Sequence, residues 1–135
     1  MLKIRTAQED ALADEDFVRR LIAHIQARAP DSAAKLTYQQ LRIVARHGIT
    51  VARSYDLRSE RDLAAFTFDM LTINPRFHSQ RELHGILKDP EIPVAERMDR
   101  VTAAPDESWT EAASMTDAAE YWQAVFDREP AGGAS

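Results

Sequence analysis

Histidine is the side chain that most often binds metals or moves protons near neutral pH, and this chain of 135 residues has four, at positions 24, 47, 78 and 84. No two of them are four residues apart and His-Glu-x-x-His does not occur, so the helical zinc motif is absent. His78 and His84 are six residues apart across an expected connector. This spacing permits a shared metal site but does not indicate one. We expect no metal site, and we expect the histidines to be exposed or partly buried.

Other groups that carry out chemistry are also scarce. The chain has no cysteine, which excludes disulfides, a thiolate nucleophile and Cys-ligated zinc or iron–sulfur sites. Its four glycines are too few for a Gly-rich phosphate loop, and Gly-x-Ser-x-Gly does not occur. Several hydroxyl side chains are explained as helix caps, namely Thr37, Ser59 and Thr116. We therefore expect no cofactor and predict that the protein is not an enzyme.

Arginine is concentrated between residues 39 and 66, where five occur: Arg42, Arg46, Arg53, Arg58 and Arg61. The segment superficially resembles a helix-turn-helix, but its apolar spacing runs through Gly48, where that motif needs a sharp turn. The chain also has a net charge of −5, whereas phosphate binding favours a basic face. These features argue against a nucleic-acid partner. The alternative is that the arginines pair with nearby carboxylates or with the acidic C-terminal segment.

Charge is divided unevenly along the chain. Residues 1–88 have 14 basic and 11 acidic side chains, whereas residues 89–135 have 3 and 11, so the two parts have net charges of +3 and −8. This division indicates that the two parts attract each other or that the acidic part meets a basic partner. A solvated acidic surface is the alternative, because exposed ion pairs contribute little to stability.

Large aromatic side chains gather near the C-terminus. Tyr and Trp are enriched at interface hot spots because they bury a large area at a low cost in entropy. We predict that these side chains bind a partner together with arginines of the segment around Gly48; the alternative is that they cap the core of the bundle. The predicted partner-binding residues are Trp109, Tyr121, Trp122, Phe126, Arg42, Arg46 and Arg53.

The elements that must position these residues are helices. Apolar residues recur every three or four positions, and alternation with a period of two is not sustained anywhere. The pattern predicts helices over about 14–28, 37–55, 59–73, 80–87 and 93–101, weaker helices over 6–12 and 107–114, and one from 116 or 117 to about 126. The predicted fold is therefore all-α, a single compact bundle of about six or seven helices with no sheet.

Local signals mark the predicted helix starts. Thr37 with Gln40 forms a capping box, Ser59 precedes Asp62 in the same manner, and acidic residues 14–16 are expected to cap the first long helix. Gly48 has two interpretations: it lets another helix pack closely, or the helix breaks there. The unbroken apolar spacing around it favours close packing.

The expected organisation has three parts. Residues 1–104 form the bundle, residues 105–128 form an acidic helical extension that packs on the bundle or on a partner, and residues 129–135 are a flexible tail. The apolar stretches are a few residues long, against about 20 needed to cross a bilayer, and the first residues lack the apolar core of a signal peptide. We therefore expect a cytoplasmic protein without membrane contact.

Several short segments between residues 1 and 104 carry a resemblance to a known family. These segments are Lys3-Ile4-Arg5 with Gln8, Ala29-Pro30, Gly48-Ile49 with Ala52 and Tyr55-Asp56-Leu57, Glu60 and Asp62 with Phe66 and Met70-Leu71, Ile86-Leu87 with Asp89-Pro90, and Glu96-Arg97-Met98. In these segments the chain resembles small, all-helical bacterial proteins encoded beside effector and spike genes of type VI secretion systems. Asp56 stands where those proteins usually have glycine. The resemblance implies an accessory role, as an adaptor or chaperone for a secreted effector, and carries over no catalytic residues.

Three functions remain open at this point. The first is a non-enzymatic accessory protein that binds an effector or spike protein. The second is a cytoplasmic immunity-type inhibitor, whose acidic C-terminal third would cover a basic site on a toxin. The third, from a different class, is a small nucleic-acid-binding regulator. The sequence leaves the oligomeric state open.

Overall fold

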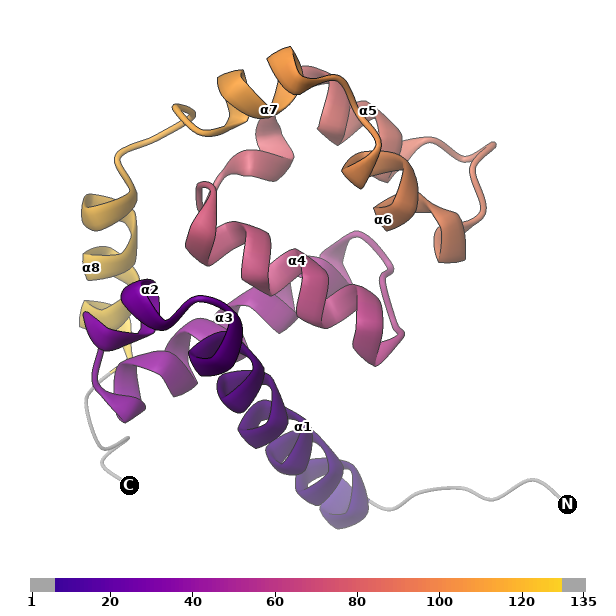
Figure 1. Ribbon diagram of the computed structural model, residues 1–135. Coiled ribbons are helices and arrows are strands. Elements are labelled where there is room, and N and C mark those ends of the chain that lie inside the picture. The colour runs from indigo at the N-terminus through magenta and orange to yellow at the C-terminus, as the bar shows by residue number, and fades with distance from the viewer. Residues whose placement is uncertain (1–6, 130–135) are drawn as a thin grey trace, which may run out of the picture.

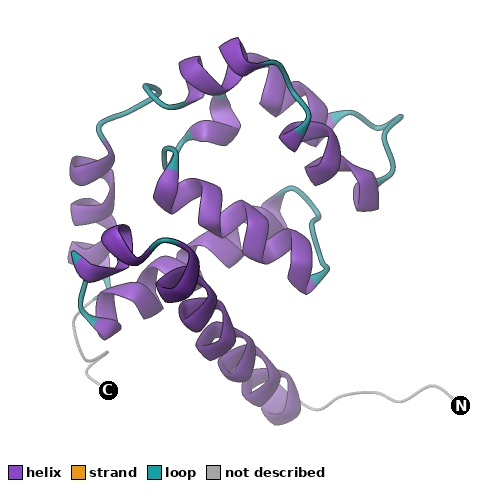
Figure 2. Cartoon of the chain, viewed as in Figure 1, coloured by secondary structure: helices purple, strands orange, loops and turns teal. Residues whose placement is uncertain are grey.

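The computed structural model describes the backbone of residues 7–129 and the side chains of residues 14–129. Over this range the chain is all-helical and has no strand (Figure 2), which confirms the predicted fold class. The described residues form eight α-helices and one 3₁₀ helix, slightly more than the six or seven predicted. These are α1 (Ala7–Arg28), α2 (Pro30–Ala34), α3 (Tyr38–Ser54), α4 (Glu60–Thr72), η1 (Phe77–Ser79), α5 (Arg81–Lys88), α6 (Val94–Thr102), α7 (Asp106–Ala112) and α8 (Ala118–Arg128).

Helices α3 and α4 pack against each other at the centre of the molecule (Figure 1). Helix α1 contacts both of them, and α6 packs on α4 next to α5. The C-terminal helices α7 and α8 follow the outside of this arrangement, with α7 against η1 and α8 against α3. The largest fully buried side chains are Phe66 and Phe77, both 0% exposed, and their ring centroids lie 5.0 Å apart.

Helix α3 begins at the predicted capping box and runs unbroken through Gly48. Gln40 N donates to Thr37 Oγ1 over 3.0 Å, and Thr37 N donates to Gln40 Oε1 over 2.9 Å. A Cβ added at Gly48 would lie 2.5 Å from Thr67 Oγ1 on α4. The close-packing interpretation of Gly48 is therefore confirmed, and the continuous helix excludes the sharp turn of a helix-turn-helix at this position.

Asp56 lies in the turn that ends α3. Asp56 has a φ of 67°, in the left-handed region that glycine adopts at lowest cost. Asp56 N donates to Arg53 O and Leu57 N donates to Ala52 O, which is the hydrogen-bond pattern of a Schellman motif. Leu57 is then fully buried, so the turn directs the chain from α3 toward α4.

The first part of the chain differs from the prediction. A single helix, α1, replaces the two predicted over 6–12 and 14–28, so residues 14–16 lie inside a helix and do not cap one. No proline or glycine interrupts residues 7–28, and helix formation continues where nothing breaks it. Pro30 ends α1 as predicted, yet it also occupies the first turn of α2, a short helix that the sequence analysis missed.

The predicted C-terminal parts are also located. In α8, Trp122 and Val125 are buried at 7% and 2% exposure, so the acidic extension packs on the bundle in this chain. Glu129 is exposed and is the C-cap of α8, and residues 130–135 of the predicted tail lie outside the described residues. The segment Lys3-Ile4-Arg5 of the family resemblance also lies outside them.

Candidate functional site

The aromatic residues predicted on the last helix form one cluster. The ring centroids of Tyr121 and Trp122 are 5.2 Å apart, and those of Trp122 and Phe126 are 6.3 Å apart. Trp122 is buried, whereas Tyr121 and Phe126 are half-buried. Trp122 therefore caps the core, and its two neighbours line the boundary between the core and the surface.

Tyr121 joins α8 to α3 through His47, a residue to which the sequence analysis assigned no specific role. His47 Nε2 and Tyr121 Oη are 2.6 Å apart, and the imidazole also lies edge-to-face against Trp122 with ring centroids 5.7 Å apart. Burial lowers the pKa of His47, and the Arg128 guanidinium adds to this effect. Burial also raises the pKa of the Tyr121 hydroxyl, so both groups are held in their neutral forms near pH 7.

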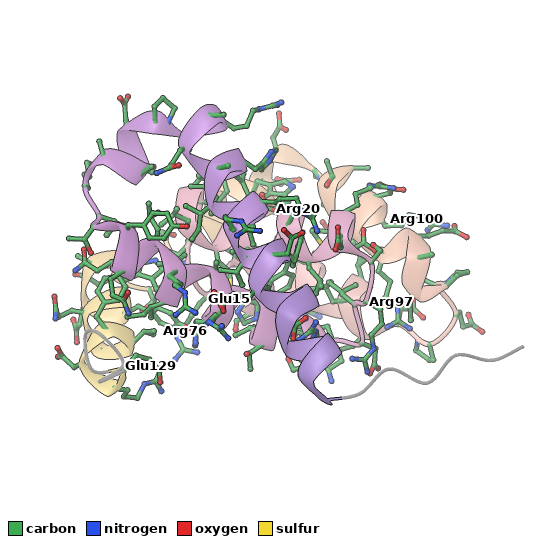
Figure 3. The ribbon with its side chains drawn as sticks, turned by 90° about the horizontal axis from the view of Figure 1, so that it is seen from below. Glu15, Arg20, Arg76, Arg97, Arg100 and Glu129 are labelled. Carbon is green, nitrogen blue, oxygen red and sulfur yellow. The ribbon has the colours of Figure 1, made fainter. Side chains whose placement is uncertain are left out.

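Open cavities lie on both sides of this contact. One, of about 370 Å³, is lined by Ile43, Arg46, His47, Thr50, Val125, Arg128 and Glu129. On the other side the guanidinium of Arg76 lies over the ring of Tyr121, 5.2 Å from its centroid. Arg76 lies beside α8 and Glu129 lies at its C-terminal end (Figure 3). Aromatic and arginine side chains side by side in a half-exposed setting are the composition that interface hot spots favour.

Trp109 does not belong to this cluster. Its ring stacks on Phe77, with centroids 5.8 Å apart and planes 16° apart. Its indole Nε1 donates to Val101 O over 3.2 Å. These contacts attach α7 to η1 and α6, so Trp109 has a packing role and the structure separates it from the aromatic residues of α8.

The three predicted arginines of α3 are paired with carboxylates of α1. Arg42 Nη2 donates to Glu15 Oε1 over 2.6 Å, Arg46 donates to the same carboxylate, and Arg53 Nη2 lies 3.2 Å from Asp14 Oδ1. The hydrogen bond from Arg42 is the main reason that the pKa of Glu15 is lowered. Glu15 lies on the face of α1 that turns toward the body (Figure 3). These three arginines therefore do not pair with the acidic C-terminal segment, whereas Arg61 of the same set pairs with Asp99 of α6.

The charged side chains of that acidic segment are exposed along α7, α8 and the chain that joins them. Between residues 105 and 129 there are seven acidic side chains and one basic side chain, Arg128, and all eight are exposed. Every ion pair between described residues has its carboxylate on a residue from 14 to 99. We call the following set the acidic face: Asp106, Glu107, Glu111, Asp117, Glu120, Asp127 and Glu129.

His78 and His84 meet around a hydroxyl group. Tyr55 Oη lies 3.0 Å from His78 Nδ1 and 3.1 Å from His84 Nδ1. His78 Nε2 donates to the carbonyl of Pro75, so its Nδ1 accepts from Tyr55, and burial lowers the pKa of His78 to about 4. The pair shares a hydrogen-bond network that joins α3, η1 and α5. Within residues 14–129, no three His, Asp or Glu side chains are grouped as metal ligands would be.

One catalytic spacing was missed by the sequence analysis. Ser32 and Lys35 are three residues apart, as in the Ser-x-x-Lys motif of some acyl-transfer enzymes. Ser32 lies in the short helix α2 and the exposed Lys35 ends it. No hydrogen bond joins the two side chains in the described part of the chain, so the spacing lacks the geometry of a nucleophile and its base.

Comparison with protein-family models, curated proteins and solved structures finds no match to this chain. The resemblance to accessory proteins of type VI secretion systems therefore stays a prediction. Among the described helices, none combines the length and the apolar character that a bilayer crossing requires.

Proposed function

We propose that this protein is a non-enzymatic accessory protein that works by binding another protein, and that the acidic face is its main contact surface. The main observation behind this proposal is that the carboxylates at the two ends of the chain differ in their ion pairing. The described carboxylates of α1, those of Asp14, Glu15 and Asp16, have arginine partners. The seven carboxylates of α7, α8 and their connections have none among the described residues. Exposed charges of one sign increase the rate and selectivity of association with a surface of the opposite sign. The partner should therefore present a basic surface.

The half-buried aromatic side chains beside this face support the same proposal. Tyr121 lies next to Glu120 in sequence and shares an open cavity with Asp117 and Asp127. Interfaces combine a few large aromatic anchors with a charged rim. The acidic face would supply the rim, and Tyr121 with Phe126 would supply the anchors.

The family resemblance gives this proposal its biological setting. It implies that the partner is an effector or spike protein of a bacterial secretion system of type VI, and that the chain acts as an adaptor or chaperone in the cytoplasm. A second candidate is an immunity-type inhibitor of a toxin. The acidic face favours this candidate as well, because a toxin that acts on an anionic substrate has a basic site that such a face would cover.

A third candidate, a nucleic-acid-binding regulator, has less support. The arginines that would contact phosphates, Arg42, Arg46 and Arg53, are paired with carboxylates of α1. A nucleic-acid partner would have to displace these carboxylates and approach a chain with a net charge of −5.

The test uses two variants with equal changes in net charge. In the first, Glu107→Gln, Glu120→Gln and Asp127→Asn remove three charges of the acidic face. In the control, Asp31→Asn, Glu91→Gln and Glu96→Gln remove three exposed charges elsewhere, none of them in a described ion pair. A partner is captured with the tagged wild-type chain from the native host, identified by mass spectrometry, purified, and titrated by calorimetry with all three proteins.

We expect the dissociation constant to rise about tenfold for the first variant, since three interfacial charges at roughly 0.5 kcal/mol each correspond to that factor. The control should bind like the wild type, and higher salt should weaken the wild-type complex. Equal affinities for the wild type and both variants would contradict the proposal. An inhibitor abolishes the toxicity of its partner, whereas an adaptor leaves it intact, so a toxicity assay separates the first two candidates.

A further inference from the structure

Helix α8 is attached to the bundle by a small set of contacts. Its principal neighbour is α3 (Figure 1), against which it buries Trp122 and Val125. The chain that leads into α8 is held by the buried Asn74, whose Nδ2 donates to Ala113 O and Thr116 O over 3.2 and 2.9 Å. A terminal helix with one main neighbour separates from a fold more easily than a central helix does.

One contribution to the free energy of docking α8 on α3 is unfavourable. The indole Nε1 of Trp122 is buried, and none of the described residues accepts a hydrogen bond from it. A buried donor that has lost water without gaining an acceptor opposes the arrangement that buries it. Separation of α8 from α3 would return this group to water.

His47 and Tyr121 form the polar contact across this interface. Their atoms Nε2 and Oη are 2.6 Å apart, and the His47 ring lies edge-to-face against both Tyr121 and Trp122. A neutral imidazole accepts the Tyr121 hydroxyl hydrogen at Nε2 and carries its own proton on Nδ1. A proton added at Nε2 reverses this hydrogen bond, places a positive charge in a half-buried contact, and leaves the hydroxyl hydrogen in need of another acceptor.

We propose that the contact between His47 and Tyr121 is a pH-sensitive latch, which holds α8 on α3 at neutral pH and releases it when His47 is protonated. Release would present the apolar face of α8, with Trp122 and Val125, to solvent or to a partner. The latch itself concerns this chain alone. The consequence for a partner rests on the proposed function.

Charged groups from each neighbouring element surround His47. The positive groups are Arg46 on α3, Arg128 on α8 and Arg76 before η1; the negative ones, Asp117, Glu120, Asp127 and Glu129, are all exposed. Burial is the largest cause that lowers the pKa of His47, Arg128 lowers it further, and Glu129 opposes them. The docked helix therefore resists protonation of His47, whereas a released helix would let the pKa return toward 6.5.

The sign of the pH effect follows from this difference. The pKa of His47 is lower in the docked state than in the released state. His47 therefore stabilises docking fully when the pH is above its ordinary pKa, and this stabilisation is lost as the pH falls toward the lowered value. Between the two pKa values, the ratio of docked to released α8 should fall by up to tenfold per pH unit.

Hydrogen exchange of the intact chain tests the latch. Protection factors, corrected for the intrinsic pH dependence of exchange, are measured at pH 7.5 and pH 5.5 for amides of α8 and of the central helix α4. We expect the protection of α8 to fall several-fold at the lower pH while that of α4 is retained. His47→Gln should abolish this pH dependence, and the matched variant His24→Gln, which changes an exposed histidine of α1, should leave it intact.

A second measurement keeps the test decisive even where His47→Gln does not fold. The pKa of His47 is measured by NMR in the wild type and in Val125→Asn, which weakens the docking of α8 without adding charge. We expect the pKa to be higher in the variant, closer to 6.5. Equal pKa values in the two proteins, unchanged protection of α8 at pH 5.5, or a parallel loss of protection in α8 and α4 would each overturn the proposal.

Discussion

Gly48 and Gly85 lie inside helices α3 and α5, and replacing each with alanine should change stability in opposite directions. An added Cβ at Gly48 would lie 2.5, 2.6 and 2.8 Å from Oγ1, Cγ2 and Cβ of Thr67. Rotation of Thr67 does not move its own Cβ, so α3 and α4 must separate to accept the alanine. An added Cβ at Gly85 meets nothing within 4 Å.

The magnitudes follow from two opposing effects. Alanine is favoured over glycine in a helix interior by about 1 kcal/mol, so Gly85→Ala should raise the free energy of unfolding by roughly 0.5 to 1 kcal/mol. At Gly48 this gain is opposed by overpacking, which costs about 1–3 kcal/mol and occasionally more. Because three atoms of one side chain lie under 3 Å away, we expect Gly48→Ala to lower the free energy of unfolding by about 2 kcal/mol.

The assay is urea unfolding followed by far-UV circular dichroism, with equal slopes required for the wild type and the variants. Thr67→Ala removes two of the three close atoms, together with a buried hydroxyl that has no partner among the described residues. In the Thr67→Ala background, Gly48→Ala should lower the free energy of unfolding by on the order of 1 kcal/mol less than it does in the wild type. A Gly48→Ala variant as stable as Gly85→Ala would refute the close approach of α3 and α4.

Three further changes test other parts of the structure. Asp56→Gly should raise the free energy of unfolding by about 1 kcal/mol in the same urea assay, because Asp56 has a φ of 67°; a loss would contradict the described turn. Burial raises the pKa of Asp69 to about 7 from an ordinary value of 3.8, so Asp69 favours the fold below pH 4 and this contribution is lost as the pH rises to 7. Asp69→Asn should therefore stabilise the chain at pH 8, by on the order of 4 kcal/mol relative to its effect at pH 4; equal effects at both pH values would refute the burial of this carboxyl. Trp122→Ala should lower the free energy of unfolding by about 3 kcal/mol, since Trp122 is 7% exposed; an unchanged melting temperature with weaker partner binding would instead place Trp122 in the interface.

The elements that sequence analysis predicted well depend on local signals. The capping box at Thr37 and the cap at Ser59 each involve residues close in sequence, and the structure confirms both. The errors arose where a local signal had two meanings. Residues 14–16 have the composition of a helix start but lie inside α1, and Pro30 ends one helix while it begins the next.

The candidate site was harder to predict because its contacts join distant parts of the chain. His47 and Tyr121 are 74 residues apart, and neither the spacing nor the type of the two residues indicates that they meet. The same is true of Arg42 and Glu15: Arg42 was predicted to bind a partner, and in the structure it pairs with Glu15 of the same chain. Charge composition was the useful signal, because the acidic face could be recognised from the residues after Pro105 alone.

The most direct test of the central claim is hydrogen exchange of the complex with the captured partner, compared with the free chain at the same pH. We predict that amides of α7 and α8 gain protection on binding. Protection confined to α1, α3 and the other helices, with α7 and α8 unchanged, would contradict the assignment of the acidic face as the binding surface.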